Sequence, residues 1–273
     1  MSQVIVAGAL DNLRENLVRQ LQEASKLGSV HVALWTDDAV QAVTGQPPKF
    51  PLEERNYFIS AIRYVETVTT VDAPVDANSL PDGFASEGDT WVILEDENSP
   101  EKQSFCQQNG LRLHVVTDDQ LSAIPDEPID LAASPAGVKK VIVTGCYDWF
   151  HSGHIRFFEE VSELGDLYVV IGHDDNIKLL KGEGHPMFNE FQRRYMVQAV
   201  RFVKAALVSS GEGWLDAEPE IARIKPDIYA VNEDGHQPVK ENYCKDHGIE
   251  YKVLRRTPKE GLPKRQSTDL RGF

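Results

Sequence analysis

The sequence predicts an α/β protein made of two tandem, doubly wound, Rossmann-like domains with parallel sheets, and two observations lead to this prediction. Short β-branched runs closed by glycine alternate with amphipathic segments, a pattern typical of a parallel sheet covered by helices on both faces. The stretch that starts at Val4 also recurs from Val141, which indicates two copies of one unit. A chain of 273 residues is long enough for two modest domains, each with its own core.

The self-similarity covers two blocks that occur in the same order in both copies. Residues 4–28 lie beside residues 141–165 without a gap, and roughly a third of these positions are identical. With one residue inserted, "EERNYFISAIRYVETV" then lies beside "FQRRYMVQAVRFVKAA". Matched pairs that matter for the site are Gly8/Gly145, Asp11/Asp148, Arg55/Arg193 and Arg63/Arg201.

The expected domain boundaries follow from this repeat and from one change in composition. Residues 124–137, "IPDEPIDLAASPAG", are rich in Pro, Ala and Asp and are typical of a linker. We therefore expect a first domain at 1–123, the linker at 124–137 and a second domain at 138–273.

The second copy predicts strands and helices in alternation. "VIVTG" predicts a strand that ends at Gly145, and Ile155, Phe158 and Val161 then form an apolar stripe at helical spacing. "LYVVIG" predicts the next strand, "EFQRRYMVQAVRFV" the next helix and "DIYAV" a further strand. Ligands of such sheets bind beyond the carboxyl ends of the strands, so the residues after Gly145 form the first candidate site.

Charge is distributed unevenly between the two copies. Residues 1–137 contain 8 Lys and Arg against 22 Asp and Glu, a net charge of −14, whereas the remainder carries 20 and 21, a net charge of −1. An anionic ligand is therefore expected in the second copy and not in the first. We expect no nucleic-acid partner, because such binding needs clustered basic side chains.

Targeting and redox features are those of a cytoplasmic protein. No apolar run is long enough to span a bilayer, and the N-terminus has no basic leader, so we expect neither a membrane span nor a signal peptide. Cys106, Cys146 and Cys244 lie far apart, which fits a reducing compartment and argues against a disulfide framework.

Two histidines open the helix that follows the first strand of the second copy, in "GCYDWFHSGHIRFF". His151 and His154 are three residues apart, so both can project from the same face of the first helical turn. The free N–H groups of a helix N-terminus bind anions, and Gly153 permits a phosphate to approach. Two alternatives are solvated polar residues that cap the helix, and a zinc site with Cys146 that lacks a further ligand at a familiar spacing.

These residues carry a resemblance to a known family. "GCYDWFHSGH" is similar to the H-x-G-H signature of the cytidylyltransferase-like nucleotidylyltransferases, "LKGEGHPMFNEFQRRYMVQAVRFV" to their K-G-x-x-P…E-R-Y…V segment, and "RRTPKEGLPKRQSTDL" to their R-T-x-G-x-S-T-T-D-L close. Within the family, the chain most resembles the ethanolamine-phosphate cytidylyltransferases, which also carry a tandem duplication. The resemblance covers the whole second copy, whereas the first copy shares the scaffold alone.

The resemblance implies transfer of CMP from CTP to a phosphorylated alcohol, similar to phosphoethanolamine or glycerol phosphate, with release of pyrophosphate. It implies Mg²⁺ bound with the triphosphate, for which the sequence indicates no protein ligands. A phosphate monoester is mostly dianionic near pH 7 because its second pKa is about 6, so the acceptor needs no separate activating base. Such chemistry requires positioning and charge neutralisation rather than a covalent intermediate.

The resemblance also implies roles for particular residues. Its catalytic positions fall on His151, His154 and Lys181. Its nucleotide-binding positions fall on Gly145, Cys146, Tyr147, Asp148, Gly153, Arg201, Asp234, Arg256, Ser267 and Thr268. A structural role is an equal alternative for Asp148, and Arg201 and Arg193 share this alternative, because the first copy keeps all three residue types.

Several features depart from the family pattern. The usual Gly-Asp after the "DIYAV" strand is replaced by "NEDG", which contains Asp234, and "KEGLPKRQ" lengthens the spacing before Ser267. After Ser267 and Thr268 only "DLRGF" remains, a segment so short that it is marginal as a helix, so we expect phosphate contacts there from side chains. The block around Lys181 also resembles that of the sugar-phosphate adenylyltransferases.

The remaining alternatives concern the nucleotide, the activity and the first copy. An adenylyltransferase that uses ATP on a sugar phosphate is one alternative, and a nucleotide sensor without catalysis is another. In the first copy, Arg14, Glu15, Asn16 and Leu17 replace the H-x-G-H residues, so we expect no catalysis there. That copy would serve as a packing partner, as a wall of the acceptor pocket, or as a spacer. The resemblance also suggests a homodimer.

Overall fold

A computed structural model describes residues 2–72, 76–125, 129, 131 and 134–270. The chain divides into two compact units, Met1–Ile124 and Pro125–Phe273. Residues 126–128, 130, 132 and 133 of the expected linker lie outside the described residues.

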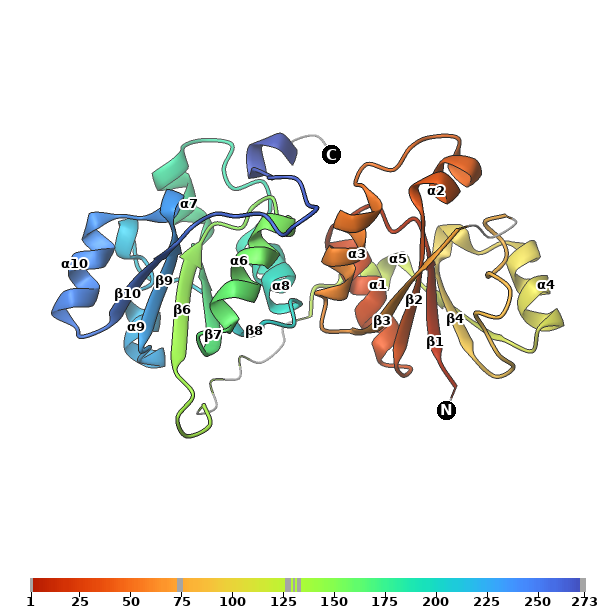
Figure 1. Cartoon of the computed structure of the whole chain (residues 1–273), viewed down its shortest axis with the longest axis horizontal. Helices are drawn as coiled ribbons and strands as arrows, with labels where there is room; N and C mark the ends of the chain where they lie inside the picture. Colours follow the sequence, from red (N-terminus) through yellow and green to blue (C-terminus); the bar gives the residue numbers. More distant parts are fainter. Residues whose placement is uncertain (1, 73–75, 126–128, 130, 132–133, 271–273) are drawn as a thin grey trace. The chain divides into compact units, whose positions relative to one another are not determined.

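The first unit is a parallel five-stranded sheet with the strand order β3-β2-β1-β4-β5 (Figure 1). Its strands are β1 Val4–Gly8, β2 Val30–Trp35, β3 Val65–Val71, β4 Thr90–Leu94 and β5 Arg112–Val116. Its helices are α1 Glu15–Ser25, α2 Asp37–Thr44, α3 Leu52–Ser60, the 3₁₀ turn η1 Glu95–Glu97, α4 Pro100–Gln108 and α5 Asp118–Ser122.

The second unit repeats this architecture, with the strand order β10-β9-β6-β7-β8. Its strands are β6 Lys140–Gly145, β7 Asp166–Ile171, β8 Val203–Val208, β9 Ile228–Asn232 and β10 Glu250–Leu254. Its helices are α6 Ser152–Ser162, α7 Asp174–Lys181, α8 Glu190–Gln198, η2 Gly213–Leu215, α9 Glu218–Ile224, η3 Glu233–Gly235, α10 Pro238–Asp246 and η4 Ser267–Leu270.

The expected fold class, a duplicated doubly wound α/β architecture, is therefore confirmed. The two sheets agree even in an irregularity of register. Between β2 and β3 the pairing skips a residue at Val30/His31, and between β7 and β8 it skips one at Leu167/Tyr168. Such bulges re-aim a strand and are features of a fold rather than defects, so both units share a detailed backbone plan.

Burial follows the apolar pattern that the sequence shows. The stripe of Ile155, Phe158 and Val161 on α6 is fully buried, as expected for a helix that packs one face on a sheet. The central strands β6 and β7 are also buried along most of their length, as both faces of a parallel sheet are covered.

Two expectations about elements need correction. The helix expected over 190–203 ends at Gln198, and a turn leads into β8 at Val203. The sequence analysis also did not identify β8 and β10 as strands. The segment "VKAALV" continues the apolar pattern of the helix before it, and only pairing with β7 shows that it is extended.

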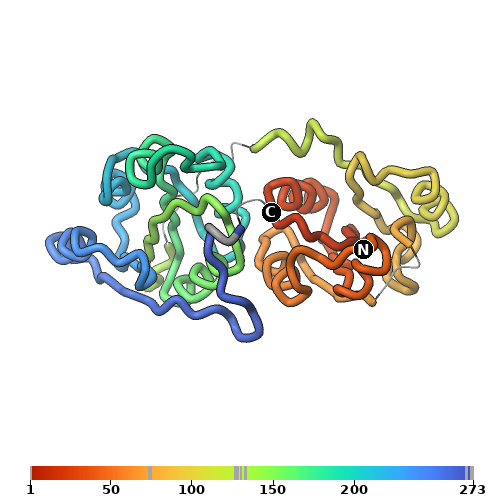
Figure 2. The backbone as a smooth tube through the Cα atoms, turned by 90° about the horizontal axis from the view of Figure 1, so that it is seen from above, coloured from red at the N-terminus to blue at the C-terminus, as the bar shows by residue number. Residues whose placement is uncertain are grey.

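Opposite faces of the second sheet are covered by different helices. The core on one face joins Ile142 of β6 with Ala217 beside α9 and Cys244 of α10. Because the strand order runs one way from β6 to β7 and the other way from β9 to β10, right-handed crossovers place α6 and α10 on opposite faces. After β10 the chain returns toward α6 in an extended segment (Figures 1 and 2).

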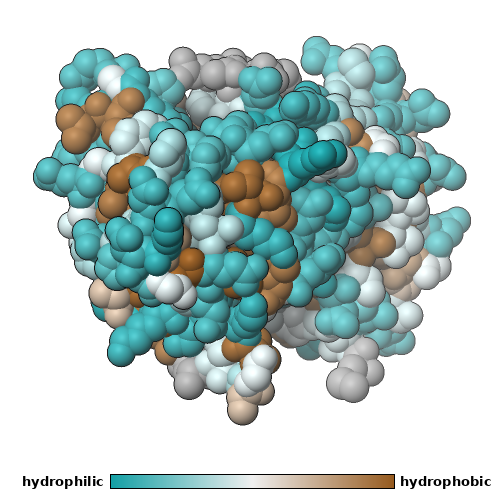
Figure 3. Space-filling view, turned by 60° about the vertical axis from the view of Figure 1, so that its left-hand side comes forward, coloured by the Kyte–Doolittle hydropathy of each residue, from teal (hydrophilic) through white to brown (hydrophobic). Residues whose placement is uncertain are grey.

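The surface in Figure 3 is mostly hydrophilic, with separate hydrophobic patches. Large exposed apolar side chains of the second unit include Leu179, Met187, Phe191 and Trp214. Among the described residues no helix combines the length and apolar character needed to cross a membrane.

Candidate active site

A cavity of about 520 Å³ opens at the carboxyl ends of the strands in the second unit. Its walls come from the ends of β6, β7 and β9, from the start of α6, from α7 and α10, and from the segment after β10. Its volume lies within the usual range for small-molecule sites, and its position is the one where doubly wound sheets bind ligands. His154 and Gly153 line it at the helix N-terminus.

His151 is the N-cap of α6. Its Nδ1 accepts a hydrogen bond from the backbone N–H of Gly153 at 3.0 Å, so the proton of the neutral ring sits on Nε2. The side chain is 2% exposed, and Nε2 has no hydrogen-bond partner among the described residues. A buried donor without a partner is costly, and His151 lies against His154, which lines the cavity, while not lining it itself.

His154 stacks on His151 with their ring centroids 4.0 Å apart. Phe150 stacks on its other side at 5.4 Å, and the edge of Tyr147 contacts it at 5.3 Å. Its Nδ1 is buried without a partner in the described part of the chain. Gly153 allows this packing, because a Cβ there would lie 2.8 Å from Cε1 of His151. The neighbouring rings therefore hold His154 in one orientation at the cavity.

Burial keeps both histidines neutral. It lowers the pKa of His151 to about 3, and the charges of Arg256 and Arg265 add to the effect. Burial also lowers the pKa of His154 far below its usual range, with His151, Arg256 and Lys181 as further causes. Near neutral pH the pair therefore acts as hydrogen-bond donors and acceptors, with the positive charge supplied by Arg256 and Lys181.

The loop between β6 and α6 has a strained backbone at Tyr147, where φ is 55°. This conformation turns the Tyr147 ring back over Gly145, where a Cβ would lie 2.7 Å from the ring. Cys146 is half-buried at the cavity wall, and burial raises the pKa of its thiol, so it is not a thiolate nucleophile. Gly145, Cys146 and Tyr147 thus form a fixed wall of the cavity.

Asp148 binds the backbone of the loop before α8. Its carboxylate accepts hydrogen bonds from the N–H of Met187 at 2.8 Å and of Phe188 at 3.0 Å. The side chain is 7% exposed, and it lines the cavity. Both oxygens are occupied by backbone donors, so in this structure Asp148 positions the loop after α7.

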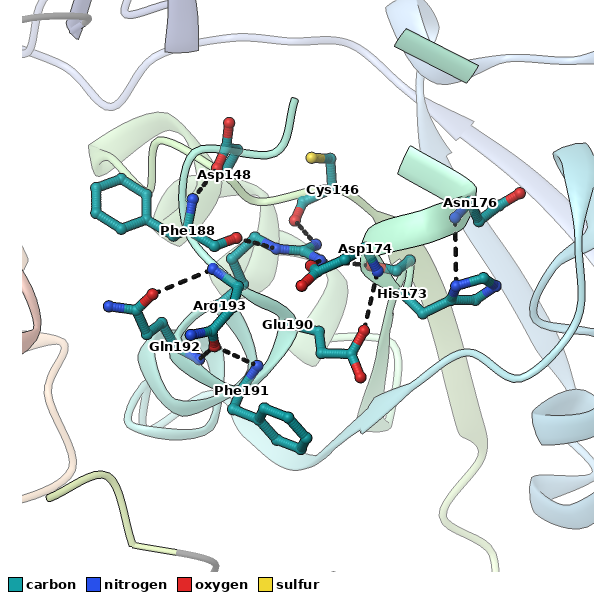
Figure 4. Close-up of polar contacts among 12 residues, drawn as sticks. Cys146, Asp148, His173, Asp174, Asn176, Phe188, Glu190, Phe191, Gln192 and Arg193 are labelled. Atoms are coloured by element: carbon teal, nitrogen blue, oxygen red, sulfur yellow. Dashed lines mark hydrogen bonds and ion pairs between the residues drawn. The ribbon is translucent and has the colours of Figure 1, made fainter. Parts of the chain in front are cut away.

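Arg193 holds the loop before α8 and the residues that follow β6 and β7. Its guanidinium donates to the carbonyls of Phe188 at 2.9 Å, Cys146 at 2.7 Å and Gly172 at 2.7 Å, and it pairs with Asp174 at 2.7 Å. Figure 4 shows the side chain between Phe188, Cys146 and Asp174, and it is 1% exposed. Arg193 therefore holds the carboxyl ends of β6 and β7 together.

Two further cations lie at the cavity. Lys181, the last residue of α7, is exposed and makes no ion pair within the described part of the chain. Arg256 forms an ion pair with Asp234, and its Nη2 donates to the carbonyl of Arg265 at 2.8 Å. The structure thus brings the sequence-indicated Asp234 to the cavity as the partner that orients Arg256.

The C-terminal segment closes the site near the histidines. Ser267 begins η4, and its hydroxyl donates to the carbonyl of Trp149 at 3.4 Å. Ser267 lines the cavity, whereas the side chain of Thr268 lies outside the described residues. Residues Ser267–Leu270, where we expected no stable α-helix, form a single 3₁₀ turn.

Two expected site residues with described side chains do not line the cavity: His151, which is 2% exposed and stacks on His154, and Arg201. Arg201 is exposed and lies in the turn between α8 and β8. Helix α8 runs back along the sheet, so the turn that follows it lies at the amino ends of the strands, the edge opposite the cavity. Arg201 does not line the cavity described here, and its nucleotide-binding role stays a prediction.

Sequence analysis missed several cavity residues, among them Lys240, Asp216 and Trp214. The internal repeat does indicate Lys240, although the motif search did not include it. "QPVKENYC" in the second copy lies beside "SPEKQSFC" in the first, which matches Lys240 with Lys102. Trp214 and Asp216 have no such match and depend on the loop after β8.

Among the described residues, no group of three or more His, Cys, Asp and Glu side chains is arranged to hold a metal ion. The cysteine and histidines considered for zinc therefore do not form such a group.

Comparisons with known proteins place this site in a family. The cytidylyltransferase-like family matches residues 142–259. A FAD synthase from Ferroglobus placidus is 37% identical over 127 residues, which cover 45% of this chain and 79% of that protein. The bifunctional protein HldE from Campylobacter jejuni subsp. doylei is 38% identical over 98 residues, 35% of this chain and 21% of that protein.

A solved structure, that of the lipopolysaccharide core biosynthesis protein from Thermoplasma volcanium, is 26% identical and covers 45% of this chain and 100% of its own, with a TM-score of 0.38. The family match lies within the second unit, where the histidine pair and the cavity are. The chain belongs to the cytidylyltransferase-like family, and its activity class is that of a nucleotidyltransferase.

Proposed function

We propose that the second unit transfers CMP from CTP to a phosphorylated alcohol, similar to phosphoethanolamine or glycerol phosphate, and releases pyrophosphate. One observation carries the proposal: a neutral, stacked histidine pair with partnerless buried nitrogens stands at a helix N-terminus beside a cavity. Fixed donors at a helix N-terminus suit the oxygens of a phosphate.

The reaction is an in-line displacement at phosphorus. An oxygen of the acceptor phosphate attacks the innermost phosphorus of the triphosphate, the bond from that phosphorus to the bridging oxygen breaks, and pyrophosphate leaves with the electron pair. The acceptor phosphate is already deprotonated near pH 7, so no proton needs to be removed from it.

Each residue at the corner has a role in this displacement. The ring of His154, which lines the cavity, binds a phosphate oxygen, and His151 stacks beside it with Nε2–H as a further donor. Lys181 and Arg256 neutralise the charge that builds on the leaving pyrophosphate. Mg²⁺ bound to the triphosphate would supply additional charge neutralisation through the phosphate oxygens. Glycine at 153 lets the His151 ring pack against the start of the helix.

Adenylyl transfer from ATP to a sugar phosphate is the second candidate. The name of the Ferroglobus placidus relative refers to FAD, an adenine-containing product, and this favours ATP for that protein. The block around Lys181 and the HldE relative point in the same direction. A nucleotide sensor is the third candidate, and it predicts binding without turnover.

A test of the proposal measures pyrophosphate release by the full chain with Mg²⁺. CTP and ATP are each paired with phosphoethanolamine, sn-glycerol 3-phosphate, glucose 1-phosphate and FMN. We expect release with CTP and one of the two phosphorylated alcohols. Release with ATP and glucose 1-phosphate would establish the second candidate, release with ATP and FMN would establish adenylyl transfer to a different acceptor, and nucleotide binding without release for any pair would favour the sensor.

We also propose that the first unit has no transferase activity. Arg14 stands at the N-cap of α1 without a capping side-chain hydrogen bond, and Leu17 in the place of His154 is buried. The unit would act as a packing partner, a wall of the acceptor pocket or a spacer. Homodimer formation stays a prediction, which light scattering of the full chain can test.

A further inference from the structure

A second cation lies at the cavity on the face of the sheet away from the histidines. Lys240 of α10 is 8% exposed and lines the cavity. Its ammonium donates to the hydroxyl of Thr144 at the end of β6, over 2.9 Å, and lies 5.7 Å from the ring centroid of Tyr229. Thr144 in turn shares a hydrogen bond of 2.7 Å with the Tyr229 hydroxyl.

This ammonium is under-satisfied by the protein. It can donate three hydrogen bonds, and among the described residues the hydroxyl of Thr144 is its one acceptor. It forms no ion pair with any described carboxylate, and burial lowers its pKa in spite of the charge of Asp216. A buried cation without a paired anion is costly, so the arrangement fits a ligand that supplies the anion.

The position of Lys240 differs from that of the cations near the histidines. Thr144 shares its face of β6 with Ile142, which packs against α9 and α10, whereas the histidines begin α6 on the other face. Arg256 and Lys181 are the cations whose charges lower the pKa of His154. The cavity thus has two cationic corners, one on each face of the sheet.

In-line displacement requires this separation. The attacking oxygen and the leaving pyrophosphate must lie on opposite sides of the reacting phosphorus. If the histidine corner holds the triphosphate, the incoming phosphate needs its own cation across the carboxyl ends of the strands. We propose that Lys240 binds the phosphate of the acceptor and not that of the nucleotide, an inference that rests on the proposed function.

The first unit provides a matched control. Lys102 of α4 is the equivalent of Lys240, is 6% exposed, and lies 5.4 Å from the ring centroid of Trp91. The residue equivalent to Thr144 is Ala7, and the first unit lacks the histidine pair. If the lysine that both units contain only packs on an aromatic ring, Lys102→Met and Lys240→Met will have the same effects on the two affinities.

The experiment is titration calorimetry with inorganic phosphate on the full chain. The protein is first saturated with Mg²⁺ and the α,β-methylene analogue of CTP or ATP that binds it, so the histidine corner is filled. We expect Lys240→Met to weaken phosphate binding at least about tenfold and to leave the affinity for the analogue within about twofold, as for loss of a charged hydrogen-bond donor. Lys102→Met should change neither affinity.

The wild-type chain supplies a second readout. Because burial lowers the pKa of Lys240, phosphate affinity should fall with rising pH below the usual lysine value near 10.4. The groups that face Lys240 are Asp216, Tyr229 and Cys244, and burial raises the pKa values of Tyr229 and of Cys244, the latter to about 11. Lys240→Arg should abolish the fall.

Three results would overturn the inference. They are equal effects of Lys240→Met and Lys102→Met, an unchanged phosphate affinity in Lys240→Met, and a parallel loss of analogue affinity in Lys240→Met. If neither analogue binds, the proposed function fails, and the same phosphate titrations without nucleotide still decide whether Lys240 binds an anion. If Lys240→Met does not fold, the pH dependence of the wild-type chain and Lys240→Arg decide it.

Discussion

The two units have one backbone plan and differ at the corner where α1 and α6 begin. Both have the same strand order and the same register shift. Leu10 and Tyr147 are equivalent positions, and both have positive φ, at 45° and 55°. The strained turn after the first strand is thus a property of the fold that persists without the histidines.

The polar scaffold is also duplicated. Asp11 accepts from the backbone N–H groups of Lys49 and Phe50, as Asp148 does from those before α8. Arg55 donates to the carbonyls of Phe50 and Ala9 and pairs with Asp37, which repeats the set of contacts made by Arg193. Persistence in both units indicates that these residues serve folding.

The residues that differ are those at the ligand corner. His151 caps α6 through its side chain, whereas Arg14 makes no capping hydrogen bond at α1. His154 presents a ring to the cavity, whereas Leu17 is 6% exposed within the core. The comparison teaches that the duplicated residues maintain the loops and that the second unit differs by the histidine pair, for which we propose the catalytic role.

The largest expected effect is on the duplicated scaffold. Arg193→Met leaves buried carbonyls and Asp174 without a partner and should destabilise the second unit by about 3–5 kcal/mol. Arg55→Met should destabilise the first unit to a similar extent. Hydrogen exchange followed by mass spectrometry measures the loss of protection in each unit. If only one of the two variants loses protection, the two arginines do not have equivalent structural roles.

The next largest effect is expected at His154, whose equivalent in the first unit is Leu17. His154→Ala should leave the fold intact and lower turnover at least about a hundredfold, as for loss of one transition-state donor. Leu17→Ala, the matched change in the first unit, should leave turnover per folded protein unchanged. Pyrophosphate release and circular dichroism measure the two properties, and near-normal turnover in His154→Ala would contradict the assignment.

A smaller effect concerns pH. The folded chain keeps His151 neutral down to pH about 3, whereas the unfolded chain binds a proton below about 6.5. Stability should therefore fall on acidification from pH 6.5 by up to about 1.4 kcal/mol per pH unit from this side chain. Thermal unfolding at pH 7 and pH 5 should show a smaller loss in His151→Asn than in the wild type. Equal losses would show that His151 is not held neutral.

The smallest expected effect is on the first unit. Arg14→His combined with Leu17→His should create no transferase activity, because the lysine block of the second copy is "TGQPPKF" in the first. Transferase activity of the first unit is measured as pyrophosphate release by this variant when the chain also carries His151→Asn and His154→Asn. Any release above that of the chain with His151→Asn and His154→Asn alone would show that the histidines alone convert the scaffold into a site.

Much of the fold was predictable because it depends on local patterns. The apolar stripe of α6 and the glycine-closed strand β6 appear as short-range periodicities, and the histidine pair is a contiguous motif. The duplication further indicated that Asp148 and Arg193 could be structural. The strand β8 was not predicted, because its apolar run continues that of the preceding helix.

What could not be predicted depends on contacts between distant segments. The pairing of Asp234 with Arg256 joins η3 to the chain after β10, and Lys240 meets Thr144 across nearly a hundred residues. The sequence did not show that Arg201 lies outside the cavity, because a motif match gives a residue type and not the edge of the sheet on which the residue lies. The sequence pattern shows neither which residues face the cavity nor which cations lack an anion.

The most direct test of the central claim is the stoichiometry of nucleotide binding. Titration calorimetry of the full chain with CTP or ATP and Mg²⁺ should give one site per chain, because one unit has the histidine corner. Binding should be lost in His151→Asn with His154→Asn and retained in Arg14→Ala. Two sites per chain, or unchanged affinity in the double histidine variant, would contradict the account.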